Sequence, residues 1–138
     1  MNVILSIKPK WAELIYSGKK TIEWRKSFPK AKNIDKVLLY ETAPVKAITG
    51  FFKFDKTVCI ESLPYIDPLI VRMGCVPFDA LKQYKGNSDC LYGWMIADVT
   101  KFEDGWSLNF VDLKRPPQSW CYVKDSACGF DKDGFFPF

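Results

Sequence analysis

Histidine is absent from this chain of 138 residues. Its absence excludes zinc sites built on imidazole and nucleophilic centres in which a histidine activates a serine or a cysteine. Any chemistry would therefore depend on lysine, carboxylate, tyrosine or cysteine side chains, or on a metal ion held by other ligands. The sequence also contains no internal repeat, no P-loop and no glycine-rich dinucleotide motif.

Long apolar runs are missing as well. No stretch approaches the roughly 18 apolar residues that a membrane-spanning helix needs, and no basic segment followed by an apolar one resembles a secretory leader. We therefore expect a cytoplasmic protein without a membrane span.

Cysteine pairs of the Cys-x-x-Cys type are also lacking, although the chain has five cysteines. In a cytoplasmic protein their thiols would be reduced, so we expect most of them to be small core side chains. The sequence thus predicts no metal site and no cofactor. The five residues are Cys59, Cys75, Cys90, Cys121 and Cys128.

The composition is that of one ordinary globular domain, with 48% hydrophobic and 26% charged residues. An aromatic share of 16% favours a compact, β-rich fold, in which large flat side chains pack on pleated surfaces. The net charge of +4 is unevenly divided, because residues 1–56 carry 12 basic and 5 acidic side chains. A basic first half would suit an anionic ligand, although it could equally serve solubility alone.

Residues 18–25 gather opposite charges inside an otherwise apolar stretch. They follow a short helix that Pro9 can begin and Gly18 can end, and they have the alternation of a strand. Alternation places Glu23 and Arg25 on one face, so Lys20 must reach them from the turn. The alternative is an exposed pair of charges on a strand, which would contribute little.

The rest of the chain indicates a small α+β domain, rich in strands and closed as a β-barrel with the helix at one end. We expect this domain to cover residues 1–124, with an irregular, partly helical insertion at 57–90 that includes a helix over 78–84 ended by Gly86. An Asp104-Gly105 pair predicts a turn. The predicted strands cover residues 3–8, 20–25, 37–40, 45–54, 90–99 and 119–123, with a bulge or bend at Gly50 and a further apolar-alternating segment at 108–113.

Two basic or aromatic segments lie outside this core pattern. The loop at 26–36 carries several lysines that would either be solvated or contact phosphate. The tail at 125–138 is rich in phenylalanine and would either fold back onto the barrel or contact a protein partner. Its Asp131 and Asp133 resemble a calcium loop, but the required glutamate downstream is missing.

The spacing Gly18-x-Lys20-x-x-Glu23-x-Arg25 resembles the signature of ASCH domains, members of the PUA-like superfamily. Two flanking segments, at 5–9 and 11–15, resemble the opening strand and helix of the family, and two more, at 39–46 and 116–119, resemble a prokaryotic and phage branch of it; together the matches cover about residues 2–123. These segments are Leu5-Ser6-Ile7-Lys8-Pro9, Trp11-Ala12-Glu13-Leu14-Ile15, Leu39-Tyr40-Glu41-Thr42-Ala43-Pro44-Val45-Lys46 with Gly50, and Pro116-Pro117-Gln118-Ser119.

The resemblance implies a pseudo-barrel with a cleft beside the first helix that holds RNA or a nucleotide. Some small ASCH proteins are amidohydrolases that act on acetylated cytidine with a lysine, a threonine and a distant glutamate. The lysine corresponds to Lys20, but Glu23 stands where those enzymes have the threonine, and Glu61 is the candidate for the glutamate.

Two hypotheses follow. In the first, the chain is a binding module, with or without a regulatory role, for RNA or a modified nucleotide, with cations neutralising phosphate and Glu23 accepting a hydrogen bond from an exocyclic amine. In the second, it is a small hydrolase, an amidohydrolase or a ribonuclease, that uses Lys20 and Glu23. The adjacent carboxylate should raise the pKa of Lys20, which favours binding over lysine-centred catalysis. The residues expected at the ligand are Ser6, Lys8, Lys20, Glu23, Arg25 and Tyr40, and a base would stack on Tyr40 or on a neighbouring tryptophan.

Overall fold

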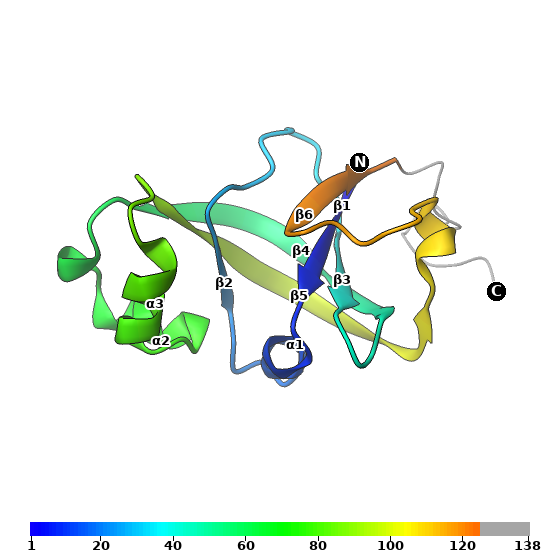
Figure 1. Cartoon of the computed structure of the whole chain (residues 1–138), viewed down its shortest axis with the longest axis horizontal. Coiled ribbons are helices and arrows are strands. Elements are labelled where there is room, and N and C mark those ends of the chain that lie inside the picture. Colours follow the sequence, from blue (N-terminus) through cyan, green and yellow to red (C-terminus); the bar gives the residue numbers. More distant parts are fainter. Residues whose placement is uncertain (125–138) are drawn as a thin grey trace.

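The computed structural model describes residues 1–124, which form one curled, mixed sheet of six strands with helices at its margins (Figure 1). The strands are β1 (Asn2–Ile7), β2 (Ile22–Arg25), β3 (Val37–Glu41), β4 (Ala47–Ile60), β5 (Leu91–Trp106) and β6 (Trp120–Val123). The helices are α1 (Pro9–Tyr16), α2 (Pro68–Gly74) and α3 (Phe78–Lys85), with 3-10 turns η1 (Leu63–Tyr65) and η2 (Leu108–Val111).

The sheet has the order β2-β5-β4-β3-β1-β6 and curls into a half-barrel. The first strand, β1, runs parallel to β3, and all the other neighbours are antiparallel. The α+β, strand-rich fold predicted from the sequence is therefore confirmed. The predicted closure of the barrel is replaced by two separate edge strands, β2 and β6.

Alternate residues of β1 point into two different apolar clusters, one on each face of the sheet. Val3, Leu5 and Ile7 belong to the cluster that packs under α1, as their alternation predicts. Ile4 belongs to a second cluster, together with Tyr40 and residues of η2 and its surroundings. All six residues of β1 are buried, because apolar clusters cover both of its faces.

The β4–β5 pair is a longer hairpin than the sequence predicts, with 14 and 16 residues in its strands. The turn predicted at Asp104-Gly105 is wrong, since both residues lie within β5. Several register shifts bend this pair, including one beside Gly50, where a bulge or bend is predicted. Such bulges let a strand continue through residues that otherwise favour turns.

The insertion between β4 and β5 begins later than predicted, because residues 57–60 still pair with β5. Its helix α3 matches the predicted helix at 78–84 and ends before Gly86. The helix α2 was not predicted; Pro68 starts it, and Asp67 caps it by accepting a hydrogen bond from the backbone of Leu69. The apolar-alternating segment at 108–113 forms the turn η2 instead of extended chain.

Several expectations concern exposure rather than secondary structure. The four cysteines within residues 1–124 are exposed or half-buried, so the prediction that most cysteines are core residues is wrong for them. Within the same residues, no helix has the length and apolar character needed to cross a membrane. The phenylalanine-rich tail and its predicted contacts lie outside the described residues.

Substituting Gly50 tests the close approach of β4 to α1 and β5. A methyl group at this position would meet the backbone oxygen of Thr100 and lie 2.7 Å from the Tyr16 hydroxyl oxygen. We expect Gly50→Ala to lower the free energy of unfolding by about 3 kcal/mol or more, the upper part of the range for overpacking. Urea denaturation measures this change.

The matched control is Gly18→Ala, where φ is +82° and no atom lies within 4 Å of an added methyl group. That variant carries only the cost of a left-handed backbone, about 1–2 kcal/mol. A Gly50→Ala variant as stable as Gly18→Ala would contradict the packing described here.

Candidate functional site

The turn after α1 brings the charged segment into place. Gly18 has the left-handed backbone that ends a helix, and the backbone N–H groups of Lys19 and Lys20 both donate to the carbonyl of Leu14. The chain then enters β2, which pairs with β5. Lys20 is therefore fixed in the turn, at the base of the strand that carries Glu23 and Arg25.

Glu23 lies between two cations. Its Oε1 is 3.3 Å from the Nζ of Lys20, and its Oε2 accepts hydrogen bonds from the Nε and Nη2 of Arg25 at 3.1 and 2.7 Å. The side chains of Lys20, Glu23 and Arg25 are only 1%, 7% and 12% exposed. This arrangement confirms that Glu23 and Arg25 share a face and that Lys20 reaches them from the turn.

Arg25 also bridges the open side of the half-barrel. Its Nη2 donates to the backbone oxygen of Ser6 on β1 at 2.8 Å, and its Nη1 donates to the Oγ of Ser119, just before β6, at 3.2 Å. A guanidinium has five N–H donors. Four of them are used by these partners and Glu23, so one donor on Nη1 remains for a ligand.

Lys20 is held from its other side by the insertion. Its Nζ donates to the backbone carbonyl of Gly74 at the end of α2, and it lies 5.1 Å from the ring centre of Trp11. The backbone N–H of Thr21 donates to the neighbouring carbonyl of Met73. The carboxyl end of a helix carries a partial negative charge that stabilises a cation, so the ammonium group of Lys20 favours the docking of α2 at this position.

Burial controls the protonation of Lys20. Removal from water lowers the pKa of Lys20 below its ordinary value, and the charge and hydrogen bond of Glu23 oppose this only in part. The expectation that Glu23 would raise the pKa of Lys20 overall is therefore wrong, because desolvation by α2 and Trp11 outweighs the carboxylate.

A cleft of about 410 Å³ opens above Glu23 and Arg25. The predicted residues Ser6, Lys8, Glu23 and Arg25 all line it. The complete lining comprises Ser6, Lys8, Trp11, Glu23, Trp24, Arg25, Thr42, Val76, Leu81, Tyr84 and Gln118.

Two predicted ligand residues do not line this cleft. Lys20 lies behind Glu23, where it holds the carboxylate. Tyr40 is 7% exposed and packs in the apolar cluster with Ile4 and Leu38, so the structure does not bring it to the cleft as a stacking platform. Glu61 lies elsewhere too, on a second cleft of about 380 Å³.

The aromatic side chains of the cleft are Trp11 from α1, Trp24 from β2 and Tyr84 from α3. Burial raises the pKa of Tyr84, and the positive charge of Arg25 opposes this increase. Lys26, in the predicted basic loop, lies 5.0 Å from the ring centre of Tyr84. Trp11 and Tyr84 lie on segments that the sequence predicts as helices, and Trp24 lies on a predicted strand, but the sequence could not tell which of these side chains meet the cleft.

Comparisons with known proteins identify the family of the chain. Residues 5–105 match the family model of the ASCH domain. The chain belongs to the ASCH domain family. An ASCH domain-containing ribonuclease of Zymomonas mobilis is 32% identical to it over 132 residues, which cover 89% of this chain and 84% of that protein.

Solved ASCH structures share the fold. The crystal structure of ASCH from Zymomonas mobilis aligns with a TM-score of 0.80 at 22% identity, covering 91% of this chain and 90% of that one. A tyrosine-to-phenylalanine variant of the same protein aligns with a TM-score of 0.80 at 21% identity, over 91% and 92% of the two chains. The PUA-like half-barrel is thus the ASCH fold.

The buried cation predicts a dependence of stability on pH. Because the pKa of Lys20 is lower in the folded chain than the ordinary value of about 10.4, the unfolded chain binds more protons between the two values. The contribution of Lys20 to the free energy of unfolding therefore rises with pH in that window. We expect the wild type to gain stability relative to Lys20→Met as the pH is raised towards about 10.

Urea denaturation of both proteins across this alkaline range measures the difference. Lys53→Met is the control, since Lys53 is an exposed lysine of β4 and should show no such gain. A wild-type advantage that stays flat or falls with rising pH would show that the folded state does not lower the pKa of Lys20.

Proposed function

We propose that this ASCH domain binds single-stranded RNA, with one nucleotide in the cleft above Glu23 and Arg25. The observation that carries the proposal is the buried Lys20–Glu23–Arg25 cluster at the floor of a cleft lined by aromatic side chains. Buried charges are costly to desolvate, so a cluster that adjoins a cleft is better explained by recognition than by stability.

The lining supplies the groups that recognise a nucleotide. Lys8 and the remaining N–H of Arg25 suit a phosphate or a base edge, while the rings of Trp11 and Tyr84 offer a face to a base. Stacking on such a ring contributes about 1–3 kcal/mol and is tolerant of sequence. Glu23 can still accept a hydrogen bond from an exocyclic amine, and Lys20 acts by holding that carboxylate.

The relatives support RNA as the ligand class, since the similar protein of Zymomonas mobilis is named a ribonuclease. The volume of the cleft supports one nucleotide at a time, because about 410 Å³ lies at the lower end of small-molecule sites. A strand would then continue towards Lys26, whose ammonium lies 5.0 Å from the ring centre of Tyr84 at the edge of the cleft.

Removing the positive charge at Lys8 tests this proposal. Each phosphate contact to single-stranded nucleic acid contributes about 0.7 to the slope of log affinity against log salt concentration. We therefore expect Lys8→Ala to weaken binding of a fluorescently labelled, mixed-sequence RNA and to reduce that slope by about 0.7. Anisotropy titrations at several salt concentrations measure both.

Lys53→Ala is the matched control, because Lys53 is exposed on β4 and does not line the cleft. If Lys8→Ala and Lys53→Ala changed the slope equally, the charge of the whole protein, and not the cleft, would be responsible for binding.

A ribonuclease activity is the second candidate, favoured by the name of the similar protein and by the carboxylate in the cleft. The 2′-oxygen of the bound nucleotide would attack the adjacent phosphorus, and the bond from phosphorus to the 5′-oxygen would break. Glu23 would accept the proton of the 2′-hydroxyl, water would protonate the departing 5′-oxygen, and a 2′,3′-cyclic phosphate would remain. Lys20 would keep Glu23 in position.

The amidohydrolase reading has less support. Glu23 occupies the position of the threonine, and the candidate glutamate, Glu61, lies on the second cleft.

The cleavage route requires a free 2′-hydroxyl, so the substrate itself supplies the test. We expect RNA to be cleaved to products that end in a cyclic phosphate, whereas the same sequence with 2′-O-methyl groups should bind and remain intact. General-base catalysis typically contributes about 10²–10⁴-fold, so Glu23→Gln should lower the rate by that factor. Gel analysis and mass spectrometry of the products measure these outcomes.

Cleavage of the 2′-O-methyl RNA would rule out this route. Binding without cleavage of either RNA would leave the domain as a binding module only.

A further inference from the structure

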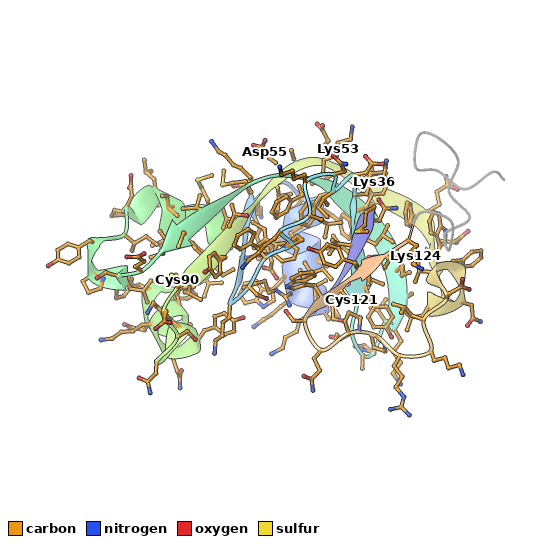
Figure 2. All side chains as sticks on the ribbon, turned by 90° about the horizontal axis from the view of Figure 1, so that it is seen from above. Lys36, Lys53, Asp55, Cys90, Cys121 and Lys124 are labelled. Carbon is orange, nitrogen blue, oxygen red and sulfur yellow. The ribbon has the colours of Figure 1, made fainter. Side chains whose placement is uncertain are left out.

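Two cysteines and a glutamate meet at one end of the β4–β5 hairpin, outside the cleft. Cys59 is near the end of β4, Glu61 directly follows that strand, and Cys90 directly precedes β5. The two sulfurs and a carboxylate oxygen all lie within 4.8 Å of one another. Figure 2 shows Cys90 at the end of the molecule that carries the helices of the insertion.

The pairing of the two strands explains this meeting. Cys59 pairs with Tyr92 and Ile60 with Leu91, so the next position places Glu61 opposite Cys90. Opposite residues of antiparallel strands share a face, and so do residues two apart on one strand. The three side chains therefore extend from one face of the strand pair.

Their chemistry suits a borderline-soft divalent ion. Thiolates and carboxylates are ordinary zinc ligands, and a tetrahedral zinc ion with Zn–S distances of about 2.3 Å holds two sulfurs about 3.8 Å apart. Ligand atoms already within 4.8 Å would need to close by only about 1 Å. Cys59 and Glu61 are exposed and Cys90 is half-buried, so an ion can reach all three.

We propose that Cys59, Glu61 and Cys90 bind a divalent zinc-type ion that joins the two ends of the insertion. The fourth ligand position would be taken by water. Residues 62–89 lie between Glu61 and Cys90, so the ion would close this segment at its base. Closing a flexible segment in this way lowers the entropy of its unfolded state, and so couples ion binding to local folding.

The insertion forms one wall of the cleft, so an ion bound at its base would also affect the cleft. Leu81 and Tyr84 of α3 line the cleft, and the carbonyl of Gly74 in α2 holds Lys20. An ion at the base of the insertion would restrict the element that carries these three residues.

The alternative to ion binding is a disulfide bond between Cys59 and Cys90. The two possibilities differ at Glu61, because a carboxylate ligand contributes to ion binding but not to a disulfide. Glu61→Gln therefore separates them.

Titration of the reduced, metal-free full chain with cobalt(II), an optical substitute for zinc, tests the proposal. We expect a thiolate-to-cobalt charge-transfer band that saturates at one ion per chain and disappears when zinc is added. Cys59→Ser and Cys90→Ser should abolish the band. Glu61→Gln should weaken cobalt binding by at least about tenfold, the lower end of what the loss of even an outer-shell partner costs.

Cys121→Ser is the matched control and should leave the titration unchanged, because Cys121 lies on β6, outside the cluster. Far-ultraviolet circular dichroism confirms that each variant is folded.

Three outcomes would overturn the proposal. They are the absence of the band in the reduced wild type, its survival in Cys59→Ser or Cys90→Ser, and unchanged cobalt affinity in Glu61→Gln. A Cys59–Cys90 disulfide found by mass spectrometry in a protein that shows no cobalt band would assign the pair to redox chemistry instead. None of these results bears on RNA binding, whose test depends on Lys8.

Discussion

The carboxylate of Glu23 is the interaction on which the rest of this structure depends. It forms ion pairs with two basic side chains that arrive from different directions, Lys20 from the turn after α1 and Arg25 from the same strand. Removing one partner of a buried ion pair typically costs about 3–5 kcal/mol, because the remaining charge is left unpaired. Each cation in turn holds a different part of the fold. Lys20 receives the end of α2, whereas Arg25 contacts β1 and the segment before β6. The carboxylate thus links the insertion to the half-barrel at the floor of the cleft.

The half-barrel leaves its two edge strands without a shared ladder of backbone hydrogen bonds, and side chains span the gap instead. Arg25 joins β2 to β1 and to Ser119, and the indole of Trp120 donates to the hydroxyl of Ser27, just after β2. Side-chain bridges occupy less of the edge than a strand would. Room therefore remains for a cleft at the place where a closed barrel would have continuous backbone pairing.

Local sequence patterns correctly predicted features that depend on neighbouring residues, such as strand faces and helix ends. They could not predict features that depend on contacts between segments far apart in the sequence. Strand alternation was enough to place Glu23 and Arg25 on one face, and Gly18 was enough to end α1. The lowered pKa of Lys20 depends on the docking of α2 more than 50 residues away, which no local pattern encodes. The same holds for Cys59 and Cys90, which are brought together only by the register of β4 and β5. At Asp104-Gly105 the local pattern predicts a turn that is not formed. Both residues instead lie in β5, whose pairing with β4 is interrupted there by a bulge.

The helix α3 has a face on each of the two clefts. Leu81 and Tyr84 line the cleft above Glu23, while Phe78, Lys82 and Lys85 line the second cleft beside Glu61. A displacement of α3 that widens one cleft therefore alters the other at the same time. Two occupants that need different positions of this helix would weaken each other by equal free energies, and two that need the same position would strengthen each other equally. One short insertion between β4 and β5, with helices α2 and α3, is thus sufficient, in geometric terms, to give a domain of this size two thermodynamically linked surfaces.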